Sequence, residues 1–126
     1  MARKPTVRPT PAELEILGVL WDRGPATVRQ VHEALGDDKG TGYTTTLKLM
    51  QNMTDKGLLR RDESNRSHVY QSVAVQESTQ RTLVQDMVTR VFGGSAAKLV
   101  LHALSSGVIT RKEIAEIRKL LDGRGR

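Results

Sequence analysis

The clearest pattern of polar and apolar positions lies between residues 42 and 70, where it predicts a helix followed by two short strands. Four positions recur at the i, i+3, i+4, i+7 spacing of a buried helix face: Thr46, Leu49, Met50 and Met53. The polar positions that fall outside this face are Thr44, Thr45, Lys48, Gln51 and Asn52. One face of the helix is therefore expected to pack against a core, while the other can contact a partner.

The segment after this helix is predicted to form a β-hairpin. Gly57 provides the left-handed conformation that often follows a helix end, so the chain is expected to turn there into a strand at residues 58–61. The second strand contains residues 68–70 and follows a short basic turn at residues 63–66. A helix and hairpin in this order are typical of a helix-turn-helix reader of double-stranded DNA that carries a β-hairpin wing.

Three Thr-x-x-Glu/Gln capping boxes mark further helix starts, because each satisfies backbone N–H groups of the first helical turn. They are Thr10–Glu13, Thr27–Gln30 and Thr110–Glu113. The first helix is expected to end at Gly24-Pro25, with an inward face formed by Leu14, Leu17, Gly18 and Trp21. The second is expected over residues 28–35, followed by a turn at residues 36–42.

Three more amphipathic helices are predicted beyond the hairpin, the first at residues 75–92 and the others beginning after Ser95 and Thr110. Three helices in about 48 residues make a poor independent core, so we expect them to form a homodimer. The alternative is that they fold back on the N-terminal domain. The residues expected to mediate dimerisation are Val84, Met87, Val88, Val91, Leu99, Val100, Ala103, Leu104, Ile114, Ile117, Leu120 and Leu121.

The predicted fold is therefore mainly α with a small β-hairpin, a winged helix-turn-helix domain followed by a helical dimerisation region. Four segments are expected: a flexible basic arm at residues 1–9, the DNA-binding domain at 10–72, the dimerisation domain at 73–122 and a disordered tail at 123–126.

Composition narrows the class of partner. The net charge of +6 and the pI of about 10.1 favour a polyanion, although charge alone does not separate nucleic acid from an anionic membrane. The chain has no cysteine, which excludes disulfides and thiolate metal sites. No apolar run approaches the roughly 18 residues of a membrane span, so membrane insertion is not expected. We expect a cytoplasmic location instead.

The candidate DNA contacts lie on the predicted reading helix, at helix N-termini and on the hairpin. Small hydroxyl residues at the start of a reading helix allow close approach to bases, so Thr44 and Thr45 with Lys48 are expected in the groove. Arg66 at the hairpin tip is expected to contact phosphate or the minor groove, and Arg60 and Arg61 alternate faces, so which of them faces DNA is open. Plausible phosphate partners at helix starts are Thr27, Arg29 and Tyr43. The competing interpretation is that these residues form an ordinary solvated surface.

An enzyme is not expected. His32, His68 and His102 lie far apart in the sequence and are interpreted as structural, and no spacing of histidines and carboxylates is typical of a metal site. No catalytic residue, metal or cofactor is therefore predicted.

The same residues resemble the penicillinase and methicillin-resistance repressor family of the BlaI/MecI type over nearly the whole chain. The resemblance rests on an ordered set of short matches: Glu15-Ile16-Leu17, Leu20-Trp21, residues 27–31, Tyr43-Thr44-Thr45, residues 56–59, Asn65-Arg66, Tyr70, Gly93-Gly94, residues 99–101 and 113–117. Members of this family are winged-helix dimers that repress β-lactamase and related genes. The resemblance implies base contacts near Thr44, Thr45, Leu47 and Lys48, wing contact by Arg66, and helical dimerisation after about Val75.

The sequence departs from the family pattern at several positions. Asn52 stands where the family often has Arg, and Leu47 is apolar where some members place a polar reader, which leaves the operator sequence open. Some members are cut by a sensor protease within the fifth helix between Asn and Phe, and the matching bond here is His102–Ala103. A copper-responsive branch uses C-terminal cysteines, which this chain lacks.

The function expected from these features is that of a homodimeric, sequence-specific DNA-binding repressor of transcription acting on an inverted-repeat operator, controlling β-lactamase or related stress genes, with a sensor protease as a further partner. The alternative is a winged-helix module for protein–protein assembly, whose polar helix face docks a protein instead of DNA.

Overall fold

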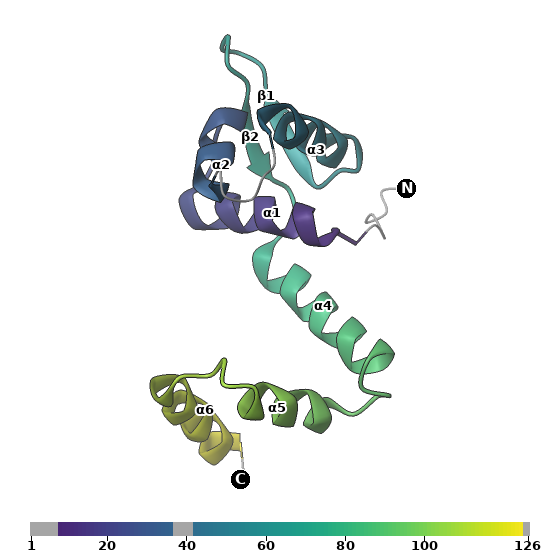
Figure 1. Ribbon diagram of the computed structural model, residues 1–126, viewed down its shortest axis with the longest axis vertical. Helices are drawn as coiled ribbons and strands as arrows, with labels where there is room; N and C mark the ends of the chain where they lie inside the picture. The colour runs from purple at the N-terminus through teal and green to yellow at the C-terminus, as the bar shows by residue number, and fades with distance from the viewer. Residues whose placement is uncertain (1–7, 37–41, 125–126) are drawn as a thin grey trace. The chain divides into compact units, whose positions relative to one another are not determined.

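Six helices and a two-stranded antiparallel sheet follow one another in the computed structural model, which describes residues 8–36 and 42–124. The chain divides into two units, residues 1–79 and 80–126. The elements, labelled in Figure 1, are α1 (Pro11–Arg23), α2 (Val28–Leu35), α3 (Tyr43–Asp55), β1 (Leu59–Asp62), β2 (Val69–Ser72), α4 (Gln76–Arg90), α5 (Ala96–Ser105) and α6 (Arg111–Arg124).

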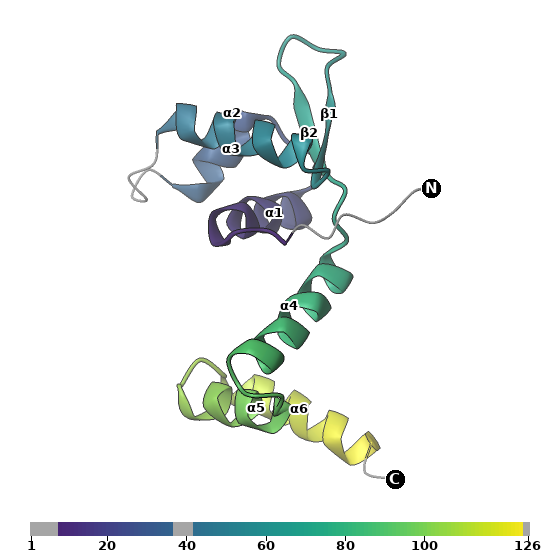
Figure 2. The ribbon, with the colours of Figure 1, turned by 90° about the vertical axis from the view of Figure 1, so that its right-hand side faces the viewer.

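The hydrophobic core lies in the first unit, where α1, α2 and α3 pack against one another and against the base of the hairpin (Figure 2). Burial of these apolar side chains removes them from water and supplies the main driving force for folding of this unit. The buried apolar residues are Ile16, Leu17, Leu20, Ala26, Val28, Val31, Met50, Met53, Leu58, Leu59 and Tyr70.

The predicted faces of α3 are confirmed. Thr46, Met50 and Met53 are at most 1% exposed, and Leu49 packs against the core from its edge. The buried Thr46 hydroxyl has a polar partner, because its Oγ1 lies 3.0 Å from Nδ1 of His32 on α2. A hydrogen-bonded hydroxyl can be buried at little cost, so this contact holds the start of α3 against α2.

The predicted inward face of α1 contacts the core but omits three of the four buried residues of this helix. Leu17 is buried, and half-buried Leu14 and Trp21 pack against the core from its edge. The other buried residues of α1 are Glu13, Ile16 and Leu20. Apolar residues occupy most positions from 14 to 21, so periodicity alone allows more than one face. Packing against the other elements of the core decides which face of α1 is buried.

The hairpin register places Arg60 opposite Gln71 and Arg61 opposite Tyr70. Gly57 has a φ of +86°, the left-handed conformation expected where the chain leaves α3. Tyr70 is 2% exposed and lies in the core, and its backbone forms a bridge with Ala26 through hydrogen bonds of 2.8 and 2.9 Å. The base of the wing is therefore fixed to the segment that precedes α2.

All three predicted capping boxes are present. Thr10 pairs reciprocally with Glu13, Thr27 with Gln30 and Thr110 with Glu113 through hydrogen bonds of 2.9–3.2 Å. The Ser95 side chain likewise caps α5 by accepting a hydrogen bond from the backbone N–H of Lys98. These starts are local in sequence, and for that reason they were predictable.

The second unit contains the rest of α4 together with α5 and α6, and none of its described residues from 80 to 123 is buried. Its helices nevertheless expose large apolar side chains, such as Val91 (65%), Leu101 (62%) and Leu120 (66%). The helix α6 runs to Arg124 and so includes two residues of the segment predicted as a disordered tail. The predicted arm before Arg8 and most of the predicted 36–42 turn lie outside the described residues, as does the end of the tail.

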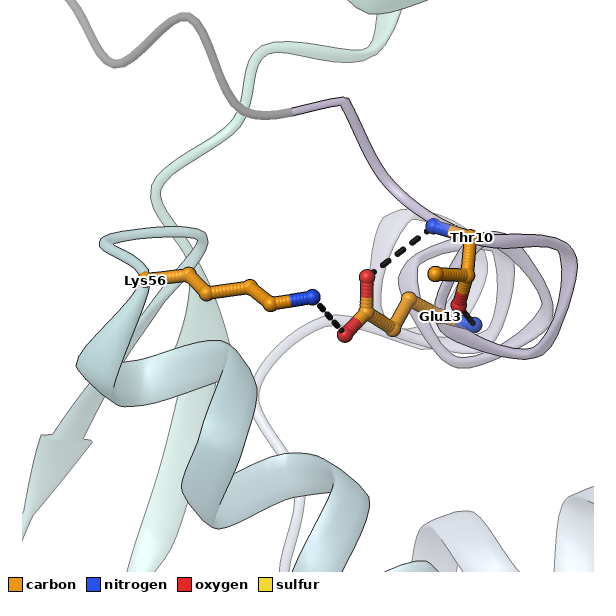
Figure 3. A network of polar contacts seen from close by, with 3 residues as sticks. All are labelled: Thr10, Glu13 and Lys56. Atoms are coloured by element: carbon orange, nitrogen blue, oxygen red, sulfur yellow. Dashed lines mark hydrogen bonds and ion pairs between the residues drawn. The ribbon is translucent and has the colours of Figure 1, made fainter.

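A partly buried ion pair connects the start of α1 to the end of α3 (Figure 3). Glu13 Oε2 lies 2.6 Å from Nζ of Lys56, while Oε1 accepts the backbone N–H of Thr10. The Glu13 side chain is 3% exposed and that of Lys56 is 34% exposed. Burial alone would raise the pKa of Glu13, but the hydrogen bond from Lys56 and those with Thr10 outweigh it, so the pKa lies below the usual 4.5.

Replacement of Glu13 by Gln should lower the free energy of unfolding at pH 7 by about 1–2 kcal/mol, because it removes a charge-assisted hydrogen bond. Because folding lowers the pKa of Glu13, the ionised pair stabilises the fold above pH 4.5, and this contribution is lost as the pH falls through the lowered pKa. Urea unfolding of the full chain at several pH values measures both effects. The gap between wild type and Glu13→Gln should narrow below pH 4.5, whereas exposed Glu33→Gln should change stability little at any pH. A gap that widens toward low pH would contradict this account.

Candidate nucleic-acid interface

The exposed face of α3 presents polar side chains from its first turn onward. Tyr43, Thr44, Thr45, Lys48, Gln51 and Asn52 are all exposed, whereas Leu47 is half-buried and packs against the core. The buried residues of α3 occupy the opposite side, so the helix offers a polar surface on a fixed support. Hydroxyl, amide and ammonium groups of this kind can hydrogen-bond to base edges and phosphates.

Tyr43 at the start of α3 is held by two residues of α2. The guanidinium carbon of Arg29 lies 5.4 Å from the centre of the Tyr43 ring, and the His32 ring meets the same ring edge-on at 5.9 Å. Both contacts are favourable, the first because a cation is attracted to the face of an aromatic ring. Arg29 and Tyr43, which were predicted as separate phosphate partners, therefore form one cluster with His32.

A groove of about 730 Å³ lies between the start of α2, the exposed face of α3 and the hairpin. It brings together six of the predicted site residues: Thr27, Arg29, Tyr43, Leu47, Arg61 and Arg66. The remaining members of its wall are Val28, Gln51, Glu63, Ser67, His68 and Tyr70. Three arginines in one groove give it a positive character suited to a polyanion.

The hairpin register distinguishes Arg60 from Arg61. Arg61 shares its side of the hairpin with Tyr70 and lines the groove, while Arg60 is exposed and does not line it. Hydrogen bonds with Tyr70 and with Glu63, whose Oε2 lies 2.7 Å from Arg61 Nε, raise the pKa of the Arg61 guanidinium above its already high value. Arg61 is therefore a permanently charged and oriented group beside α3.

Several predicted residues lie outside this groove. Thr44, Thr45, Lys48 and Asn52 are exposed on α3 without lining it. Conversely, sequence reasoning did not select Gln51, Ser67 or His68 as site residues, although Gln51 was placed on the polar face. His68 is exposed at the hairpin and lines the groove, and its position next to the basic turn was the available signal. His32 does have the expected structural contacts.

The residues predicted for dimerisation are all accessible. Val84, Met87, Val91, Val100, Leu104, Leu120 and Leu121 are 41–66% exposed, and Val88, Leu99, Ala103, Ile114 and Ile117 are half-buried. The predicted cleavage bond, His102–Ala103, lies within α5, where the His102 carbonyl accepts the backbone N–H of Ser106 at 3.0 Å. The His102 ring also contacts the ring of Phe92, at 5.3 Å between centres.

Neither a metal site nor a membrane-spanning helix is found in the described part of the chain. No group of three or more His, Cys, Asp or Glu side chains there is placed to hold a metal ion. No helix within the described ranges is long and apolar enough to cross a membrane.

Three helices with a hairpin beside the third, and a basic groove between them, define a winged helix-turn-helix DNA-binding domain. The sequence profile of the penicillinase repressor family matches residues 9–123. The chain therefore belongs to the penicillinase repressor (BlaI/MecI) family. It is a transcriptional repressor with a DNA-binding domain and not an enzyme.

Individual relatives agree with this assignment. The transcriptional regulator BlaI of Mycobacterium tuberculosis is 32% identical over 92 residues, which cover 71% of this chain and 67% of that protein. The methicillin resistance regulatory protein MecI of Staphylococcus aureus is 22% identical over 88% of this chain and 90% of its own length. The solution structure of the DNA-binding domain of the repressor BlaI superposes with a TM-score of 0.50 at 22% identity, covering 60% of this chain and 90% of that domain.

The two strand arginines provide a matched test of the interface. Arg61→Ala should weaken binding of the full chain to a random-sequence duplex by about threefold at low salt, because it removes one phosphate-neutralising charge beside α3. Arg60→Ala, which removes the same charge from the other side of the strand, should have a smaller effect. Fluorescence anisotropy with a labelled duplex measures both. A larger loss for Arg60→Ala would mean that the opposite side of the hairpin faces DNA.

Proposed function

We propose that the chain represses transcription as a homodimer that binds an inverted-repeat operator, with α3 of each copy in the major groove. The observation that carries this proposal is the exposed polar face of α3, backed by a buried face and flanked by the basic groove of the wing. A helix of about 10–12 Å diameter fits the major groove, where each base pair presents a distinct pattern of donors and acceptors.

Base reading is assigned to the first two turns of α3. Thr44 and Thr45 are short and exposed, so their hydroxyl and methyl groups can approach bases closely, and Lys48 lies one turn further along. Asn52 lies a turn beyond Lys48, and its amide can pair with adenine. Half-buried Leu47, beside these residues, offers an apolar contact of the kind that a thymine methyl group accepts.

Positioning on the phosphate backbone is assigned to the groove residues. The N-terminus of α2 carries Thr27 and Arg29, and a helix N-terminus attracts anions. Tyr43 is oriented by Arg29 and His32, and Arg61 and Arg66 extend the positive surface along the hairpin. Contacts of this type fix the register of a protein on DNA but carry little sequence information.

Homodimerisation is supported by the second unit, whose described residues include many exposed apolar side chains and none that is buried. Apolar stripes of this extent are normally covered by a partner. A second copy covers them with the same residues, and a two-fold dimer also presents two reading helices to a two-fold operator.

The relatives supply the class of target gene that we propose. Their names concern methicillin resistance and penicillinase repression, so we assign β-lactamase and related stress genes to this repressor. Release of repression by a sensor protease at His102–Ala103 belongs to the same proposal. Because this bond lies inside α5, cleavage requires that α5 unfold locally.

Duplex binding at two salt concentrations tests the central claim, since neutralisation of phosphates predicts a steep fall of affinity with salt. Lys48→Ala should weaken binding to a selected operator by about five- to thirtyfold and binding to random duplex much less. Arg66→Ala should weaken both to a similar degree. If Arg66→Ala were selective for the operator and Lys48→Ala weakened both duplexes equally, Arg66 would be the base-reading residue and Lys48 the phosphate contact. A chain that binds no duplex even at low salt would end the proposal in favour of protein assembly.

Val100→Glu should shift the protein toward monomer, because it places a charge among apolar residues that the proposed interface covers. The dimer dissociation constant should rise by about 100-fold or more. Lys98→Glu introduces the same side chain on the same helix at a polar position and serves as the control. Sedimentation equilibrium measures both variants. Equal effects of the two substitutions, or a monomeric wild-type chain, would contradict the assigned interface.

A further inference from the structure

Trp21 has polar contacts that neither the core nor the DNA interface uses. It is the single tryptophan of the sequence, and its Nε1–H donates to Ser72 Oγ at 3.1 Å and to the Ala74 carbonyl at 3.0 Å. The Ser72 hydroxyl in turn donates to the same carbonyl at 2.6 Å. These partners lie 51 and 53 positions away in the sequence, at the last residue of β2 and two residues beyond it. One indole group therefore fixes the point at which the chain leaves the hairpin.

The same segment is held from a second direction by backbone hydrogen bonds. The N–H groups of Val73 and Ala74 both donate to the carbonyl of Leu58, at 2.9 and 3.4 Å. Leu58 is 6% exposed and lies in the turn between α3 and β1. The exit segment, defined here as residues 72–74, is therefore bound both to α1 and to the turn that follows α3.

Apolar burial contributes little to holding this exit segment. Val73 is 48% exposed and Val75 is 64% exposed, and only Ala74 packs against the core. An alanine side chain buries too little area to fix a segment by itself. The hydrogen bonds from Trp21 are consequently the main side-chain contacts that hold it.

The exit segment also lies close in the sequence to the start of α4. Ala74 is followed by Val75 alone before α4 begins at Gln76, and the Val75 carbonyl accepts the first hydrogen bond of that helix, from Thr79. With residues 72–74 held, the connection between the bonded segment and α4 is one residue long, Val75. With them released, it extends from the end of β2 to α4, which is three residues.

We propose that Trp21 is a positioning residue for the simultaneous occupation of two operator half-sites, because it shortens the connection between the DNA-binding unit and α4. This inference rests on the proposed homodimer. When two binding units are joined, the second binds at an effective concentration that falls steeply as the connection becomes longer and looser. Trp21 touches neither base nor phosphate in this scheme and acts through the exit segment.

The test uses the full-length chain with Trp21→Phe, which keeps an aromatic ring in the half-buried site but has no N–H to donate. The probes are a duplex enriched from a random-sequence library by the wild-type chain, and the same duplex with one half scrambled. Trp21→Phe should lower the ratio of affinities for the intact and half-scrambled duplexes by about threefold, with little change in binding to the scrambled one. Val19→Ala, another half-buried apolar residue of α1, should leave the ratio unchanged.

Hydrogen exchange of the exit segment provides a second readout. In Trp21→Phe, the Val73 and Ala74 amides should exchange faster, while amides of α3 keep their wild-type rates. Faster exchange throughout the first unit, with equal losses on both duplexes, would mean that Trp21 only stabilises the fold and would overturn the inference. An unchanged affinity ratio would overturn it as well. If the wild-type chain itself does not prefer the intact duplex, the proposed homodimer on a two-fold operator fails instead.

Discussion

The DNA-binding unit depends on the packing of one face of α3 into the core formed by α1, α2 and the hairpin. Met50 and Met53 are completely buried, and burial of each such side chain is worth about 1.5–3 kcal/mol. A helix fixed in this way presents its other side to solvent in a defined orientation. The exposed threonines and Lys48 can therefore act as a pre-positioned surface without a folding step at the moment of binding.

Two polar contacts and one glycine set the placement of this helix and of the wing that follows it. His32 meets Thr46 near its start, Glu13 meets Lys56 at its end, and Gly57 allows the chain to turn from the helix into the wing. Each joins α3 to a different neighbour along the chain. Buried polar contacts of this kind are costly when unpaired, so they favour the one arrangement in which every partner is present. The wing arginines are thereby kept beside the exposed polar face of α3.

The parts of this fold that depend on local sequence were predictable. The capping boxes act within four residues, and the apolar period of α3 has one clear solution, so the helix starts and the reading face followed directly from the sequence. The inward face of α1 followed only in part, because nearly every position from 14 to 21 is apolar and the pattern did not single out Ile16 and Leu20. The burial of Glu13 was also beyond sequence reasoning, since its partner Lys56 is 43 positions away. Arg60 and Arg61 could be distinguished only once the hairpin register was known.

The two units differ in whether their apolar side chains are buried. The first has a core of its own, whereas the second exposes its apolar side chains along α4, α5 and α6. A division of this kind suits a repressor in which one part reads DNA and the other joins two copies. In the proposed homodimer, affinity for an operator depends on the connection between the parts, where the indole of Trp21 is bonded.

Methylation interference on a selected operator tests most directly whether α3 reads the major groove. Methyl groups on guanine N7 project into the major groove, and those on adenine N3 project into the minor groove. This account predicts that N7 methylation blocks binding at two clusters about one helical turn apart on one side of the duplex. Interference confined to adenine N3, or a single N7 cluster, would contradict it.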